Sequence, residues 1–160
     1  MPGLHTRLIS TEPPLNADQG AGQAVEADQQ LIAFALPSIP ESVPIARFHI
    51  RAALGFHGLV EYAVDAEIIT SELVTNAIQH ACGDGTEAVG VILVRMRKPE
   101  AVTVVVTDSS SEAPIKREPS DHGDRGRGLL VVDELSVGWG WSLRDGGKSV
   151  YAILAKEASA

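Results

Sequence analysis

Apolar residues recur along the chain at two spacings, and each spacing predicts one kind of secondary structure. The run at 31–36 is short and apolar and is followed by Pro37 and Pro40, so it predicts a strand. From Ser42, or Glu41 before it, apolar positions follow a period near 3.6, which predicts a helix that ends at Gly55 or Gly58. The apolar positions expected on this helix are Ala46, Phe48, Ile50, Ala53 and Leu54.

A second and longer helix is predicted over about 62–81. Its apolar residues recur at steps of three or four and form one stripe: Ala66, Ile69, Leu73, Ala77 and Ala81. Runs rich in β-branched residues at 88–97 and 102–107 then predict two strands, with Lys98, Pro99 and Glu100 in the turn between them.

The rest of the chain predicts a long loop, a short helix and a hairpin. Residues 109–125 are rich in Ser, Pro, Asp and Gly, and loops of this length in compact domains are functional lids or disordered segments. A helix is expected over 128–135, followed by a strand on which Trp139, Trp141 and Leu143 share one face. A turn at 145–147 leads into a last strand over 149–154.

This order of elements predicts the fold class and the domain division. Helices grouped on one face of a mostly antiparallel sheet make an α+β fold, a two-layer α/β sandwich. Residues 1–30 lack an apolar period and are expected to be a flexible N-terminal tail, followed by one folded domain over 31–156.

Composition narrows the class of protein further. The chain has 160 residues, a formal net charge of −8 and one cysteine, Cys82, which fits a reducing compartment. An acidic chain without a Lys/Arg cluster is not expected to bind DNA or RNA directly. Its N-terminus lacks a signal-peptide pattern and its apolar runs are shorter than a membrane span, so we expect a soluble, cytoplasmic protein.

Glu72 and Asn76 are the first candidates for chemistry. They lie four residues apart on the second predicted helix, so their side chains project from one side, one turn apart. A carboxylate beside an amide oxygen suits a hard cation such as magnesium, together with a base aimed at a hydroxyl or water. The alternative is an amphipathic helix with two polar residues on its rim.

Asp108 follows directly on a β-branched strand. A carboxylate at a strand end can accept a hydrogen bond from an exocyclic amine such as that of adenine. It can equally cap a turn, because Asp and Ser are ordinary turn residues.

Gly126 and Gly128 precede the short helix at a spacing of two. Such glycines let backbone approach phosphate oxygens at a helix N-terminus, where Arg125 and Arg127 would add positive charge. A flexible hinge has the same pattern. The later Gly-Lys-Ser at 147–149 is not a P-loop, because it enters a strand rather than a helix; Ser149 can either bond a water near adenine or belong to a tight turn.

The order of these motifs resembles the GHKL ATPase superfamily, which has the Bergerat, or histidine-kinase-like ATPase, fold. Within it the chain is similar to bacterial anti-sigma regulatory serine/threonine-protein kinases. The resemblance is carried by residues 67–81, by 126–132 and by Trp139-Gly140-Trp141, and it extends over about 31–154.

The resemblance implies roles for individual residues. Asn76 would coordinate a magnesium ion on the phosphates of ATP, and Glu72 would be the catalytic base. Asp108 would bind the adenine amine, with Ser110 and Ser149 near the base. The other residues implied in cofactor binding are His80, Arg125, Gly126, Arg127, Gly128 and Leu129, with 109–125 as a lid. Ser110 stands where the wider superfamily has glycine, which we expect to alter adenine packing without abolishing nucleotide binding.

The resemblance also implies a function and partners. The protein would transfer phosphate from ATP to a serine of an anti-sigma antagonist and sequester a sigma factor, a partner-switching role in transcription regulation, and it would form a homodimer. The alternative is an ATP-binding regulatory module without useful phosphotransfer. A detached histidine-kinase catalytic domain is a third and weaker alternative, because no helix with a phospho-acceptor histidine precedes residue 31.

Overall fold

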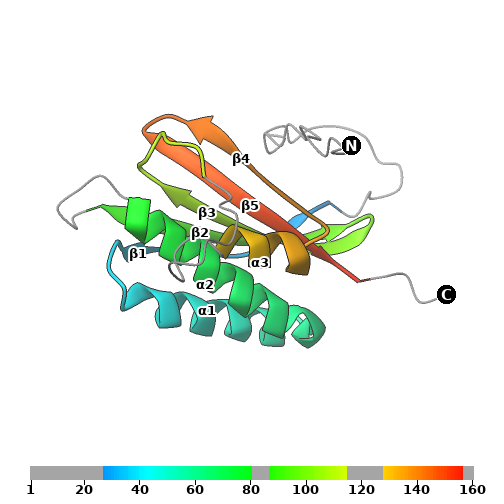
Figure 1. The fold of residues 1–160 in the computed structure, drawn as a ribbon. Coiled ribbons are helices and arrows are strands. Elements are labelled where there is room, and N and C mark those ends of the chain that lie inside the picture. Colours follow the sequence, from blue (N-terminus) through cyan, green and yellow to red (C-terminus); the bar gives the residue numbers. More distant parts are fainter. Residues whose placement is uncertain (1–26, 81–86, 115–127, 157–160) are drawn as a thin grey trace, which may run out of the picture.

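One antiparallel sheet carries helices on one of its faces (Figure 1). The computed structural model describes residues 27–80, 87–114 and 128–156. Its elements are β1 (Gln29–Pro37), α1 (Ser42–Phe56), the 3-10 helix η1 (Val60–Tyr62), α2 (Ala63–His80), β2 (Ala88–Arg97), β3 (Glu100–Asp108), α3 (Gly128–Leu135), β4 (Gly138–Arg144) and β5 (Gly147–Ala155). The strand order is β1-β2-β3-β5-β4, with each neighbouring pair antiparallel. The expected two-layer α+β sandwich is therefore confirmed.

The core lies between the sheet and the helices. Strand residues alternate between the two faces of a sheet, and directly opposed residues share a face. On β3, Val102, Val104 and Val106 are buried, and they pair with Leu154, Ala152 and Val150 of β5, which are buried too. The helix-facing side of the two central strands is thus apolar until the last pair, Asp108 and Lys148.

The stripe predicted for the second helix forms the buried side of α2. Ala66, Ile69, Leu73 and Ala77 are each at most 3% exposed, while Ala81 lies outside the described residues. This burial fixes the rotation of α2 about its axis, so the residues that flank the stripe lie along the boundary between core and solvent.

Four of the five apolar positions expected on the first helix form the buried side of α1. Ala46, Ile50, Ala53 and Leu54 of α1 are buried, but Phe48 is 67% exposed. The buried four follow steps of three and four, whereas a residue two positions from Ala46 projects from another side of the helix. Phe48 is therefore an apolar residue of α1 that lies outside the buried stripe.

The edge strand β4 is only partly covered. Trp139 packs against the core, and its Nε1 donates a hydrogen bond to Asp133 Oδ1 of α3 at 3.0 Å. Trp141 and Leu143 lie on the same face by alternation, yet they are 37% and 63% exposed. Cover from the described helices thus ends near Trp139.

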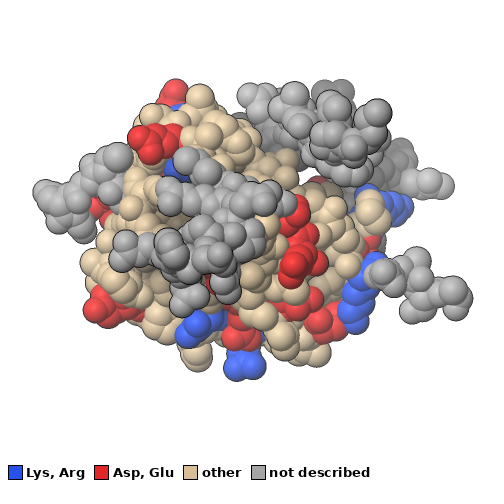
Figure 2. All heavy atoms as spheres, viewed as in Figure 1, with Lys and Arg blue, Asp and Glu red and all other residues tan. Residues whose placement is uncertain are grey.

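Charged side chains are spread over the surface seen in Figure 2, where Asp and Glu are interspersed with Lys and Arg. No broad basic area gathers on that face among the described residues. In the described part of the chain, no helix has the length and apolar character needed to cross a bilayer.

Candidate functional site

A cavity of about 380 Å³ opens where α2 and the start of α3 meet the ends of β3 and β5. This volume is within the range of small-molecule sites. Its lining combines apolar walls with polar groups: Leu73, Asn76, Ala77, Gln79, His80, Val106, Asp108, Glu112, Ala113, Pro114, Gly128, Leu129, Lys148 and Val150. Asn76, His80, Asp108, Gly128 and Leu129, all singled out from the sequence, thus converge on one cavity.

Glu72 and Asn76 both face the start of α3. A Cβ atom built on Gly128 would lie 2.6 Å from Glu72 Oε2 and 3.6 Å from Asn76 Oδ1. The Glu72 carboxylate therefore lies directly against the Gly128 backbone, and a side chain at position 128 would collide with it. Asn76 lines the cavity, whereas Glu72 stands beside it and is not among its lining residues.

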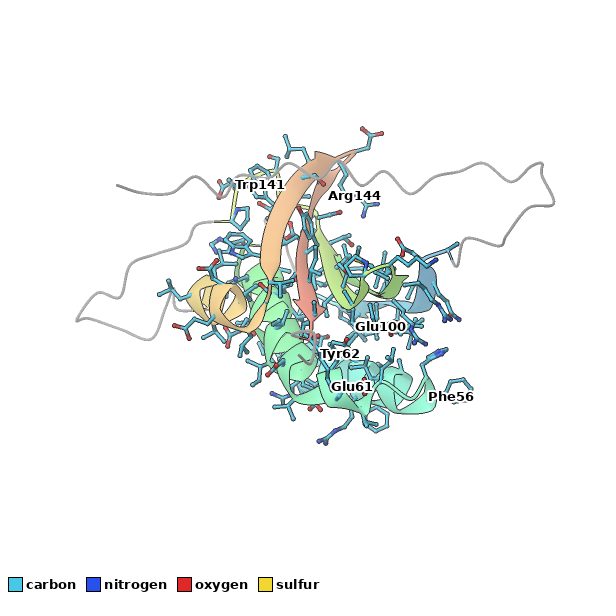
Figure 3. The ribbon with its side chains drawn as sticks, turned by 90° about the vertical axis from the view of Figure 1, so that its right-hand side faces the viewer. Phe56, Glu61, Tyr62, Glu100, Trp141 and Arg144 are labelled. Carbon is cyan, nitrogen blue, oxygen red and sulfur yellow. The ribbon has the colours of Figure 1, made fainter. Side chains whose placement is uncertain are left out.

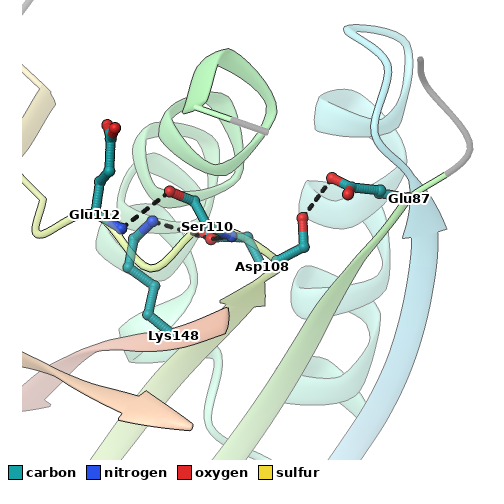
Figure 4. A network of polar contacts seen from close by, with 6 residues as sticks. Glu87, Asp108, Ser110, Glu112 and Lys148 are labelled. Atoms are coloured by element: carbon teal, nitrogen blue, oxygen red, sulfur yellow. Dashed lines mark hydrogen bonds and ion pairs between the residues drawn. The ribbon is translucent and has the colours of Figure 1, made fainter. Parts of the chain in front are cut away.

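A buried ion pair between the last residue of β3 and the start of β5 forms a polar part of the cavity wall (Figure 4). Lys148 Nζ donates to Asp108 Oδ1 at 2.9 Å, and the side chains are 5% and 4% exposed. The same oxygen accepts a hydrogen bond from the backbone N–H of Ser110 at 2.8 Å. Two donors therefore fix the position of the Asp108 carboxylate.

The segment after β3 is held by a short series of hydrogen bonds (Figure 4). The backbone N–H of Glu112 donates to Ser110 Oγ at 3.2 Å, and the Ser109 hydroxyl donates to Glu87 Oε2. Ser110 is only 2% exposed and is not part of the cavity lining. The backbone N–H of Ser110 bonds Asp108, as that of a glycine could, whereas the serine hydroxyl adds the bond to the Glu112 backbone.

Ser149 is not brought into the cavity. It pairs with Thr107, and both lie on the sheet face away from the helices, because alternation gives the helix-facing positions to Lys148 and Val150. Ser149, expected near the base, is thus not among the cavity-lining residues, whereas the neighbouring Lys148 is.

The remaining expected site residues are partly outside the described part of the chain. Arg125, Gly126 and Arg127 lie outside the described residues, as does most of the expected lid. His80, at the end of α2, is exposed and lines the cavity. Within the described ranges, no three His, Cys, Asp or Glu side chains gather as a metal site would require.

The cavity divides into two chemically different parts. Apolar walls from Leu73, Ala77, Val106 and Val150 lead to a fixed carboxylate and an ammonium, a combination suited to a flat heterocycle with polar edge atoms. Toward Asn76 and Gly128, an amide oxygen lies beside a helix N-terminus, where unpaired N–H groups favour anions.

Lys148 was missed as a site residue because, once a P-loop was rejected, Ser149 was the only residue of Gly-Lys-Ser considered for the site. One signal in the sequence could have identified it. Counting back in steps of two from Leu154 through Ala152 and Val150 places position 148 on the buried face. A lysine at a buried strand position requires a partner, and Asp108 ends the neighbouring strand.

Comparison with known proteins agrees with this geometry. A family model described as "Histidine kinase-like ATPase domain" matches residues 36–154. A search of curated proteins gives no match. A similar solved structure is the crystal structure of the RsbU and RsbW domains of Rv1364c from Mycobacterium tuberculosis, with a TM-score of 0.51 and 16% sequence identity. The match covers 77% of this chain and 32% of that chain, so this chain spans about a third of that protein, and the likeness concerns the fold.

Proposed function

Because the chain belongs to the histidine kinase-like ATPase family, we propose that it binds ATP and phosphorylates a serine of an anti-sigma antagonist protein. In this proposal the unmodified antagonist holds the kinase, and phosphorylation ends that complex because it adds negative charge to the interface. The released kinase then sequesters a sigma factor. Membership of an ATPase family implies ATP binding; the serine substrate and both protein partners are the proposed part.

One observation carries the proposal: Asn76, Asp108 and Gly128 line the same cavity although they come from α2, β3 and α3. The two chemically different parts of the cavity match the two ends of ATP, the base and the phosphates. Asp108 would accept a hydrogen bond from the adenine amine, and Gly128 would bring the N-terminus of α3 to the phosphates. The similarity to a structure that contains an RsbW domain supports the same reading.

Phosphoryl transfer from ATP to serine requires the protein to position the two reactants and involves no covalent intermediate. The serine oxygen of the antagonist would form a bond to the γ-phosphorus, while the bond from that phosphorus to the β–γ bridging oxygen breaks. ADP leaves with the bonding electron pair, and Glu72 accepts the serine proton. The contact of the Glu72 carboxylate with Gly128, a residue that lines the cavity, supports this role.

Asn76 fits a magnesium ion held mainly by phosphate. Magnesium in such sites keeps several waters and takes few protein oxygens, and the Asn76 amide oxygen lines the cavity at its phosphate end. When bound, the ion neutralises charge on the phosphate oxygens.

Helix α1 offers a surface that fits a protein partner. Phe48 is 67% exposed and lies between two arginines, of which Arg51 pairs with Glu67 at 2.9 Å. The second, Arg47, donates to Ser71 Oγ at 3.4 Å. An exposed aromatic beside positioned guanidinium groups has the composition of interaction hot spots. We propose this surface as the contact for the sigma factor or for a second copy of the chain.

A second candidate function is ATP binding and partner regulation without useful phosphotransfer. The position of Glu72 favours it, because the carboxylate packs against Gly128 and is not part of the cavity lining. In that case Glu72 would hold the start of α3 rather than act as a base.

Phosphate transfer with a matched pair of variants separates the two candidates. Wild type, Glu72→Gln and the exposed control Glu61→Gln are incubated with γ-labelled ATP and a panel of candidate antagonists, and ATP affinity is measured in parallel. We expect wild type and Glu61→Gln to label one antagonist on serine, and Glu72→Gln to lose at least about 100-fold in rate while it retains ATP binding. ATP binding without transfer by any of the three proteins would favour the regulatory module.

A further inference from the structure

Among the described residues, the Lys148 ammonium has a single hydrogen-bond partner. Its side chain is 5% exposed, and Nζ donates one hydrogen bond, to Asp108 Oδ1. An ammonium has three N–H donors, and within the described residues Nζ has no second hydrogen-bond acceptor. Burial of unused donors on a charged group is costly, so they are expected to meet a ligand or water.

The Lys148 side chain lies at the proposed base site. Lys148 and Asp108 both line the cavity, and Val106 and Val150, the next cross-strand pair on the same sheet face, line it too. An acceptor and a donor therefore stand 2.9 Å apart beside apolar walls of the cavity.

We propose that Lys148 reads the base of the nucleotide together with Asp108. This inference rests on the proposed ATP-binding function. Asp108 accepts a hydrogen bond from the exocyclic amine of adenine, and Lys148 donates one to N1, the ring nitrogen adjacent to the carbon that bears this amine. The pair then matches two neighbouring edge atoms of adenine, one a donor and the other an acceptor.

The same pair discriminates against guanine by the order of its groups. Guanine has a carbonyl oxygen at the position of the amine and an N–H at N1, so its donor and acceptor are exchanged. With the phosphates held near Asn76 and Gly128, the base cannot turn over to restore the match. Carboxylate would face carbonyl oxygen and ammonium would face N–H, which leaves buried polar groups unpaired.

The competing explanation is that Lys148 only neutralises Asp108. In that case its removal would weaken every nucleotide alike, and the ring nitrogen of adenine would make no difference to affinity. The two explanations therefore differ in whether the affinity lost on replacing ring nitrogen N1 depends on the presence of Lys148.

Calorimetric titration of the wild-type protein tests the ligand side without any substitution. The ligands are ATP, GTP and 1-deaza-ATP, in which a C–H replaces ring nitrogen N1, each with magnesium. A hydrogen bond to a charged group predicts that 1-deaza-ATP binds about 10- to 100-fold more weakly than ATP, and that GTP binds more weakly still. Equal affinities for ATP and 1-deaza-ATP would overturn the inference and leave ATP binding intact.

Lys148→Met tests the protein side, with Lys98→Met in the exposed β2–β3 turn as its control. We expect Lys148→Met to bind ATP and 1-deaza-ATP with a ratio near one, while Lys98→Met keeps the wild-type ratio. A Lys148→Met protein that still prefers ATP by the wild-type ratio would contradict the role given to Lys148. Should this variant not fold, the wild-type comparison decides alone.

The amine-free analogue, purine riboside triphosphate, separates this inference from the function on which it rests. Weaker binding of this analogue than of ATP, by wild type and by Lys148→Met, supports Asp108 as the reader of the amine. No binding of any of the four nucleotides by wild type would overturn the proposed function and the base-reading role together.

Discussion

At the scale of single residues, Asp108 and Lys148 form an ion pair whose two members depend on each other. Removing two charges from water is costly, and their attraction offsets this only while both are present. Loss of one partner is therefore expected to harm the fold more than loss of both.

We predict that Lys148→Met lowers the free energy of unfolding by about 3–5 kcal/mol, because a buried carboxylate is left without its cation. The double variant Asp108→Leu with Lys148→Met should recover most of this loss. Urea unfolding followed by circular dichroism measures both. A single variant within about 1 kcal/mol of wild type would show that water already solvates the pair.

Asn76→Ala is predicted to remove the magnesium-dependent part of ATP affinity while the fold survives, because Asn76 is the amide beside the phosphate end of the cavity. Calorimetry with magnesium and with EDTA measures that part. Gln79→Ala, on the same helix and the same cavity wall, is the control and should keep the difference. An unchanged magnesium effect in Asn76→Ala would remove the ligand role of this residue.

Individual residues also show where sequence reasoning succeeded and where it stopped. Helical spacing was enough to place Glu72 and Asn76 beside each other, because a helix fixes the relation of residues four apart. The choice between Ser149 and Lys148 depended on strand register, which is set by pairing with β3. A local motif carries no information on that pairing.

At the scale of elements, the start of β5 determines the geometry of the ion pair. Gly147 has φ +158°, and a Cβ built on it would lie 1.8 Å from the Asp108 carbonyl oxygen. Only glycine allows β5 to approach the end of β3 this closely, and that approach places Lys148 opposite Asp108.

Gly147→Ala is therefore predicted to destabilise the protein by about 2–3 kcal/mol, in the upper part of the usual range for single substitutions, and to weaken ATP binding. Gly55→Ala is the matched control, because nothing lies within 4 Å of its added Cβ in α1. In a helix this change stabilises by roughly 0.5–1 kcal/mol. Thermal unfolding distinguishes the two, and equal melting temperatures would contradict the close-approach argument.

Most elements could be predicted from periodicity, and the deviations have local causes. Helix 128–135 and strand 88–97 were predicted with the observed bounds. The strands after the two hairpin turns begin earlier than expected, because Glu100 pairs with Arg97 and Gly147 with Arg144. Turn-forming residues suggested wider loops, whereas cross-strand hydrogen bonds continue to the turn itself.

At the scale of the whole molecule, the end of the sheet away from the cavity contains a second buried polar group. Tyr62 of η1 is 4% exposed and lies near Glu61 and Glu100 (Figure 3). Burial raises the pKa of the Tyr62 phenol above 10.0, and the charges of Glu100 and Glu61 raise it further. Glu100 starts β3 and Asp108 ends it, so this group lies a full strand length from the proposed site.

This pKa predicts how stability falls in alkali. The unfolded chain loses the Tyr62 proton near pH 10.0, before the folded protein does, so the contribution to stability is fully present below that pH. It decreases as pH rises from there toward the higher folded pKa. Urea unfolding at pH 8 and pH 11 should show a smaller decrease for Tyr62→Phe than for wild type, with unchanged ATP affinity at pH 8. An identical decrease would contradict the direction of the shift.

The shared register of β3 and β5 has a consequence for how this protein can diversify. Lys148 cannot move out of the cavity by a one-residue slip, because the same slip would turn Val150, Ala152 and Leu154 outward and dissolve the core. An insertion or deletion within β5 would therefore unfold the protein rather than change its ligand preference. In relatives that prefer a different ligand, we expect substitutions at the cavity-lining positions themselves and a hairpin before β5 of unchanged length.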